Sequence, residues 1–183
     1  DEVYRTAIVQ DYSLNVSGAT DNVSYLFSGG YMNQEGLATG TGYKRFSFRA
    51  NVESKINKYL SIGMNLAPTY IVTDGSGRAN GKDSQAHKTL SSAPVSEPGV
   101  GYMTYVQPNG RYGWADTTSS PSYILNTDIS QNRTLRMVGN AFLRITPFQD
   151  FRVELSAAAN YYDLDGNKYS FSSSGKGWAK GEG

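Results

Sequence analysis

This 183-residue chain contains no cysteine, which excludes a disulfide framework and a thiolate metal site. Its 17 Lys and Arg residues nearly balance 16 Asp and Glu residues, so the net charge of +1 provides no broad basic field for nucleic acid. No apolar run reaches the roughly eighteen residues of a membrane-spanning helix, although a barrel strand needs only every second residue to be apolar. The first residues lack a Met and the basic and apolar regions of a signal peptide, so we expect an interior or processed part of a longer protein.

The first two predicted strands span about 8–17 and 22–33, and a tight turn at 18–21 joins them. A register that places Val16 opposite Val23 collects apolar side chains on one face and Ser and Asn side chains on the other. This pattern predicts an antiparallel hairpin with one apolar and one polar face.

A Gly-rich loop at 34–42 leads into the predicted strand 43–55, where the alternation is strictest. Even-numbered positions from 46 to 52 are apolar, whereas the odd-numbered ones are charged or polar, and this period of two excludes an amphipathic helix. A short turn follows, and the predicted strand 59–72 continues both faces. The next stretch, about 73–130, is rich in Gly, Ser, Pro, Asn and Asp, and we expect one long outer loop there.

The last two predicted strands span about 134–146 and 151–162, with a short turn between them and a second Gly/Ser-rich loop at 163–183. In this hairpin Arg144 can sit across from Glu154 on the polar face, which is a favourable cross-strand pair.

Short turns therefore alternate with long loops. This rhythm predicts an all-β fold of antiparallel up-and-down strands that form part of a large transmembrane β-barrel with long outer loops. Six strands are too few to close such a barrel, because the smallest has about eight. A soluble β-sandwich, as in a secreted carbohydrate-binding module, also alternates and stays as the alternative.

The twenty apolar-face positions within 46–52, 60–66, 135–145 and 151–161 carry no charge, whereas the polar faces of these strands do, and we expect these charges to face the lumen or a plug. The charged residues are Arg45, Arg49, Glu53, Arg136, Arg144, Arg152 and Glu154. Three apolar residues on the polar face, Leu26, Val138 and Phe142, are expected to pack against a plug. We expect a bulge at Gly29-Gly30 and a frayed pairing at Pro68, which cannot donate to a ladder.

Motif-sized runs extend over most of the chain in a fixed order. They are Arg5-Thr6-Ala7, Tyr12-Ser13-Leu14-Asn15-Val16-Ser17-Gly18, Val23-Ser24-Tyr25, Ser28-Gly29-Gly30-Tyr31, Asn33-Gln34-Glu35-Gly36, Tyr43-Lys44-Arg45-Phe46, Arg49-Ala50-Asn51, Leu60-Ser61-Ile62-Gly63-Met64-Asn65, Ala93-Pro94-Val95 and Asn109-Gly110-Arg111-Tyr112-Gly113. Together these runs resemble the barrel of SusC/RagA-type TonB-dependent transporters.

The resemblance implies a parent protein in the Gram-negative outer membrane that imports oligosaccharides or peptides. It also implies contacts with membrane lipid, with the rest of the barrel and its plug, with a SusD-like surface lipoprotein, and with the TonB energy-coupling complex through the parent protein. The plug and the TonB-binding segment of that family are not among these residues.

No catalytic fingerprint such as GxSxG, a P-loop or GxGxxG occurs, so we expect no enzyme and no cofactor. His87 is the single His and lies in the long loop, where an exposed residue is a better interpretation than a metal ligand or general base. The run Asp163-Leu164-Asp165-Gly166-Asn167 resembles a calcium loop, but Gly is fourth and Ser174 occupies position twelve. A tight turn explains it better, and loop-bound calcium stays as a weak alternative.

Aromatic residues gather in the long loop and could contact a ligand. They are Tyr102, Tyr105, Tyr112, Trp114 and Tyr123. Such rings stack on sugar faces, but they also pack long loops against neighbouring loops or a lid protein, which is the interpretation we favour. Tyrosines at strand ends, Tyr43, Tyr59 and Tyr161, are expected to form an aromatic girdle at the membrane interfaces.

Overall fold

The computed structural model describes residues 4–75, 105–106, 112–113, 128–148 and 150–170. Every regular element in these ranges is a β-strand. No helix long and apolar enough to span a membrane occurs in this part of the chain.

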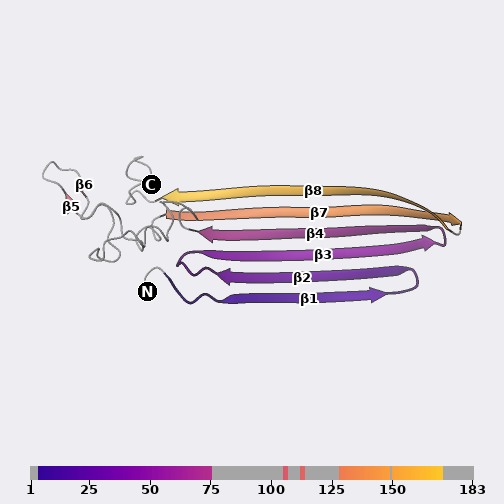
Figure 1. Cartoon of the computed structure of the whole chain (residues 1–183), viewed down its shortest axis with the longest axis horizontal. Coiled ribbons are helices and arrows are strands. Elements are labelled where there is room, and N and C mark those ends of the chain that lie inside the picture. The colour runs from indigo at the N-terminus through magenta and orange to yellow at the C-terminus, as the bar shows by residue number, and fades with distance from the viewer. Residues whose placement is uncertain (1–3, 76–104, 107–111, 114–127, 149, 171–183) are drawn as a thin grey trace.

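Six strands form one antiparallel sheet in which strands that follow one another in sequence lie side by side (Figure 1). They are β1 (Val9–Ala19), β2 (Val23–Glu35), β3 (Gly42–Asn57), β4 (Leu60–Gly75), β7 (Asp128–Phe148) and β8 (Phe151–Ser170). A separate pair, β5 (Tyr105–Val106) and β6 (Tyr112–Gly113), is also antiparallel. The expected all-β, up-and-down arrangement is confirmed.

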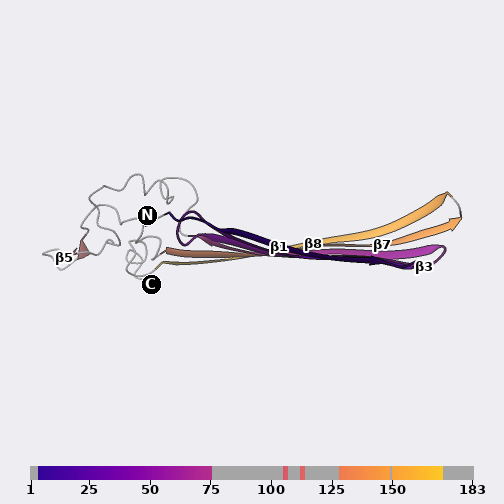
Figure 2. The ribbon, with the colours of Figure 1, turned by 90° about the horizontal axis from the view of Figure 1, so that it is seen from below.

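Seen from the side, the six strands make a single twisted layer (Figure 2). A β-sandwich requires two sheets packed face to face. The six long strands of the described chain belong to one sheet, so the sandwich alternative is wrong.

Each of the six predicted ranges overlaps one strand, but the last two strands are longer than expected. β7 begins at Asp128 rather than near 134, and β8 continues to Ser170 rather than ending near 162. The extra segments are polar and resemble loop on composition alone, yet each supplies the other with a partner, as in the pairing of Arg133 with Asp165. Strand formation here depends on the neighbouring strand more than on intrinsic propensity.

The predicted register of the first hairpin is wrong by four residues. Val16 pairs with Phe27 rather than with Val23, because β1 continues to Ala19 and the turn that reverses the chain is closed by Thr20 and Val23. The Thr20 amide donates to the Val23 carbonyl, and the Val23 amide donates to the Thr20 hydroxyl oxygen. A shift by an even number keeps every side chain on its predicted face.

The expected bulge at Gly29-Gly30 is also wrong, because both glycines pair in unbroken register with β1 and β3. Pro68 pairs with Met137 in the ladder to β7, whereas the ladder to β3 is interrupted beside it without a change of register. The register shifts of this sheet lie instead beside short turns, between Lys55 and Asn57 and between Ile145 and Phe148.

The sheet has almost no core of its own. Among the described hydrophobic residues, Ala50 alone is buried, at 6% exposure. Large apolar side chains such as Leu14 (70%) and Leu155 (60%) are mostly open. Whatever covers this apolar surface is therefore not the described part of the chain.

Candidate functional site

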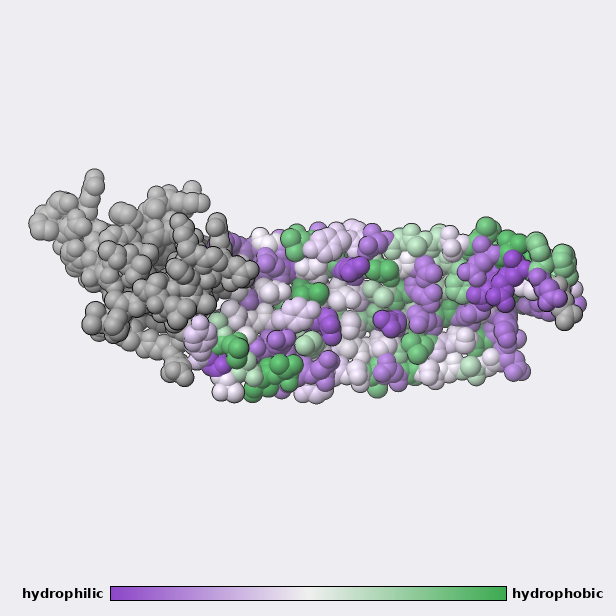
Figure 3. Space-filling view, viewed as in Figure 1, coloured by the Kyte–Doolittle hydropathy of each residue, from purple (hydrophilic) through white to green (hydrophobic). Residues whose placement is uncertain are grey.

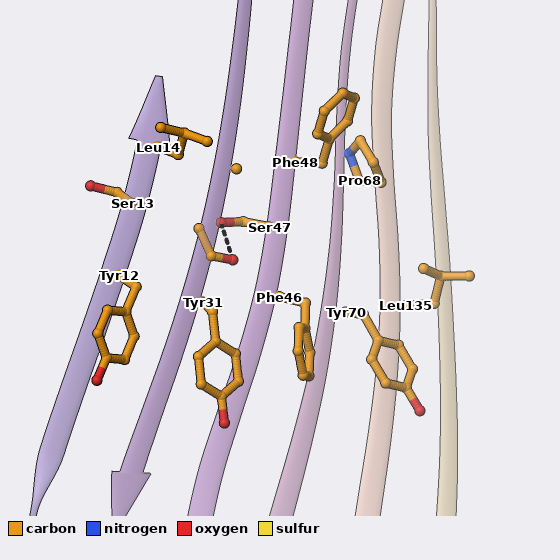
Figure 4. A pocket seen from close by; sticks show the side chains of 12 residues that line it. Tyr12, Ser13, Leu14, Tyr31, Phe46, Ser47, Phe48, Pro68, Tyr70 and Leu135 are labelled. Atoms are coloured by element: carbon orange, nitrogen blue, oxygen red, sulfur yellow. Dashed lines mark hydrogen bonds between the residues drawn. The ribbon is translucent and has the colours of Figure 1, made fainter. Parts of the chain in front are cut away.

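A row of aromatic rings crosses the apolar face near the end of the sheet that carries the long connections. Tyr12, Tyr31, Phe46 and Tyr70 are paired in register across β1 to β4. Successive ring centroids are 6.4, 4.9 and 6.5 Å apart. Figure 4 shows the rings side by side, with the tyrosine hydroxyls pointing the same way. Such a row is typical of the aromatic girdle at a membrane interface.

The girdle differs from the one expected at Tyr43, Tyr59 and Tyr161. Tyr43 lies on the polar face, because it is three positions before Phe46 in β3 and an odd separation within a strand puts two side chains on opposite faces. Tyr59 lies in the turn before β4, and Tyr161 is on the apolar face but one step below the row. Strand-end position alone did not distinguish the two faces.

The apolar face has the height of a membrane. Along β4 it runs from Leu60 to Tyr70, a rise of roughly 33 Å at about 3.3 Å per residue. A strand tilted by about 40° projects this length onto about 25 Å, the height of the apolar band in outer-membrane barrels.

A shallow hollow of about 560 Å³ opens on this face below the aromatic row. Gly29 leaves it open, because nothing lies within 4 Å of the place where a Cβ would stand. Its walls include Leu14, Phe48 and Pro68 (Figure 4). The lining contains no charged group, so the hollow suits hydrocarbon and offers no catalytic chemistry.

The opposite face is polar, and three of its charged side chains meet near the end with the short turns. Arg144 Nη1 lies 2.8 Å from Glu53 Oε1, and Arg144 Nε lies 3.1 Å from Glu154 Oε2. The pairing of Arg144 with Glu154 is the one expected from the sequence, and it is confirmed. In the space-filling view, hydrophilic side chains gather toward this end of the sheet (Figure 3).

Phe142 is the apolar member of this cluster. Its ring occupies the space beside Gly63, its direct partner on β4, where an added Cβ would clash with it. The Arg144 guanidinium lies 4.9 Å from the ring centroid, within the range of a cation–π contact. The ring thus covers a bare stretch of backbone, a use of Phe142 that the sequence alone did not indicate.

Four other arginines of the polar face take no part in the ion pairs of Arg144, and three of them lie toward the long connections. Arg45, Arg49, Arg136 and Arg152 have no ion pair among the interactions of the described residues. Two amides at mid-sheet do meet, because the Asn65 amide nitrogen donates to the Asn140 oxygen at 2.8 Å. This contact was missed, although both residues lie on the predicted polar face.

Part of the expected site lies outside the described residues. This applies to Tyr102, Trp114, Tyr123 and His87, and to the side chains of Tyr105 and Tyr112, whose backbones belong to β5 and β6.

The tight turn expected at Asp163-Leu164-Asp165-Gly166-Asn167 is wrong, since these residues continue β8 and pair with β7. Their side chains alternate between the two faces, as in any strand, rather than converging on one point. No group of three potential metal-binding side chains occurs in the described ranges.

Comparison with known proteins connects this architecture to one group of transporters. No protein-family model matches the chain. It is 24% identical over 172 residues to TonB-dependent receptor P26 of Formosa agariphila, an alignment covering 92% of this chain and 16% of that receptor. It is 31% identical over 102 residues to TonB-dependent receptor P3 of the same organism, covering 55% of this chain and 10% of the receptor. The chain is a homologue of TonB-dependent receptors.

The solved structures agree on the fold. In the closed-closed state of the RagAB peptide importer, the matched chain superposes with a TM-score of 0.68 at 23% identity, over 91% of this chain and 19% of that one. A second RagAB peptide transporter structure gives a TM-score of 0.67 at 22% identity. The resemblance stated from the sequence is confirmed, and the sheet is part of a large barrel wall.

The chain is much shorter than the proteins that it resembles. It spans well under a fifth of the curated relatives that it matches, 16% of receptor P26 and 10% of receptor P3. The matched relatives are receptors and importers rather than enzymes, in agreement with the expectation of a non-catalytic protein.

Proposed function

We propose that this chain forms part of the wall of a TonB-dependent transporter in the Gram-negative outer membrane. The observation that carries the proposal is the division between the faces of the sheet. Below the aromatic row one face is apolar and its described residues carry no charge, whereas the other face holds Arg45, Arg49 and Arg136, and Arg144 with its two glutamates. Hydrocarbon suits the first face, and a polar lumen or plug suits the second.

The parent protein would import an oligosaccharide or a peptide. Support comes from the likeness to a peptide importer and from the rings expected in the long loop, such as Tyr112 and Trp114. Aromatic rings in an outer loop offer apolar area together with hydrogen-bonding tips, which suits contact with either kind of ligand. A SusD-like lipoprotein would cover the loop side, and TonB would supply energy from the inner membrane.

Membrane residence is tested on the full-length parent protein. We expect it to sediment with the outer membrane, to resist carbonate extraction, and to dissolve only in detergent. Release into aqueous buffer without detergent would contradict the proposal.

Transport is tested by growth on candidate glycans and peptides in three strains of the host: wild type, a strain without the transporter, and a strain without TonB. We expect the two deletions to abolish uptake of the same ligand, and the transporter gene supplied in trans to restore it. Uptake that continues without TonB would contradict the energised mechanism. Co-purification of a surface lipoprotein with the tagged parent tests the SusD-like partner.

A further inference from the structure

We infer that the loop-side third of the polar face binds anionic groups of the transported ligand through Arg45, Arg49 and Arg136. This inference rests on the proposed function, and it names the chemical class of the ligand. It is carried by the spacing of the three arginines, by the lack of acidic partners for them among the described residues, and by their height in the wall.

The register brings the three side chains onto one patch. Arg45 and Arg49 flank Ser47 on β3, and Arg136 lies two strands away at the level of Ser47, across Thr69 of β4. Strands are spaced by about 4.8 Å and residues on one face by about 6.7 Å, so the Cα atoms are roughly 12–13 Å apart. Three long side chains with this spacing can reach neighbouring groups of one oligomeric ligand.

The patch has a surplus of positive charge. Arg49 and Arg136 are exposed and Arg45 is partly exposed. The ion pairs of the described polar face involve Arg144, which engages Glu53 and Glu154 at the far end.

The nearest acidic side chain on this part of the described polar face is Asp11 of β1. It shares a level with Arg45 but lies two strands away, roughly 10 Å, which is beyond ion-pair distance. Short side chains, Ser47 and Thr69, separate the arginines from one another, whereas Arg45 is flanked on its neighbouring strands by Met32 and Ile71.

The height of the patch favours the ligand as its partner. Arg45 is adjacent to Phe46 of the aromatic row, so the patch lies just below the interface on the side of the long loops. Long loops face the exterior in outer-membrane barrels, and a captured ligand enters from there. The Arg144 cluster, in which two carboxylates face one guanidinium, lies at the opposite end, among the short turns.

Guanidinium groups recognise carboxylates and sulfates by paired charge-assisted hydrogen bonds. Two sources share this chemistry, an acidic peptide and an acidic oligosaccharide. The test therefore uses one acidic and one neutral probe of each kind: pentaglutamate against pentaglutamine, and pentagalacturonate against maltopentaose.

Binding is measured by calorimetry on the full-length transporter, purified in detergent with any lipoprotein that accompanies it. The test variant carries Arg45→Gln, Arg49→Gln and Arg136→Gln. The matched control carries Lys44→Gln and Arg133→Gln, two cations at nearly the same height on the opposite face, where both pair with Val72.

We expect one acidic probe to bind at least tenfold tighter than its neutral counterpart, and to lose affinity as salt is raised. Each lost charge-assisted contact weakens binding by about tenfold or more, so the triple variant should lose about a thousandfold in affinity and the control should lose nothing. The acidic probe that binds identifies the source as peptide or oligosaccharide.

Two results would overturn the inference. One is a parent protein that binds both acidic probes no better than the neutral ones, even while TonB-dependent uptake of a neutral ligand shows that the proposed function holds. The other is a triple variant that binds normally but unfolds at a lower temperature, which would assign the arginines to contacts with the plug.

Discussion

Ala157 and Ala158 offer a direct test of what covers each face of the sheet. They are adjacent on β8, both exposed, and their side chains point to opposite faces: Ala157 pairs with Ala141 on the apolar face, and Ala158 with Asn140 on the polar face. Ala157 lies midway along the apolar face of β8, between Val153 and Tyr161. It should therefore lie near the centre of the bilayer.

An arginine at the bilayer centre costs about 2–4 kcal/mol on the lipid side, and about 0–1 kcal/mol near the interfaces. We therefore expect Ala157→Arg to lower the free energy of unfolding by about 2–4 kcal/mol. Val153→Arg, near the turn-side interface, should cost about 1 kcal/mol or less. Ala158→Arg should also cost little, because its side chain enters a polar environment.

The measurement is a reversible urea titration of the full-length protein folded into lipid vesicles, with the folded fraction read from its mobility in unheated gels. A loss of unfolding free energy that is larger for Ala157→Arg than for Val153→Arg would support hydrocarbon as the environment of the apolar face. Equal costs for Ala157→Arg and Ala158→Arg would refute the reasoning, because both faces would then be covered in the same way.

Three further predictions concern contacts within the sheet. Gly63→Ala should lower the unfolding free energy by about 1–3 kcal/mol by displacing the Phe142 ring, and adding Phe142→Ala should recover part of that loss. If the effects of the two substitutions simply add in the same titration, the ring contact is contradicted. Arg144→Gln should lower the unfolding free energy by only about 1 kcal/mol, because the side chains of the cluster are 26–44% exposed. Glu154→Gln should then lower it less in the Arg144→Gln background than alone, and a double-mutant cycle without coupling would show that the pair does not stabilise the sheet. Arg5→Ala should speed amide hydrogen exchange in the loop between β2 and β3, since the guanidinium donates to two carbonyls there at 3.2 and 3.3 Å; unchanged exchange would show that the loop holds its shape without this clamp.

Alternation explains why the faces could be predicted from the sequence. A strand places every second side chain on one face, so an error of four residues in the register of Val16 left all face assignments intact. The pairing of Arg144 with Glu154 was also within reach, because a short turn restricts the register of a hairpin.

Contacts that depend on several strands at once could not be predicted from the sequence. Glu53 meets Arg144 only because β3, β4 and β7 lie side by side in one register, and the two residues are 91 positions apart. The aromatic row likewise depends on four registers at once, so strand-end position picked the wrong tyrosines. The ends of β7 and β8 were missed because polar residues such as Asp165 are strand-forming only beside a suitable partner.

The two edges of the sheet pose a different energetic problem from its faces. Among its described hydrophobic residues Ala50 alone is buried, so the sheet gains little hydrophobic stabilisation from its own packing. In a bilayer the apolar face needs no packing partner, but the backbone does. β1 and β8 each have a single neighbour in the described sheet, and an N–H or C=O left unpaired in hydrocarbon costs several kcal/mol. In the proposed membrane location, β1 and β8 therefore both need backbone partners from outside the described sheet.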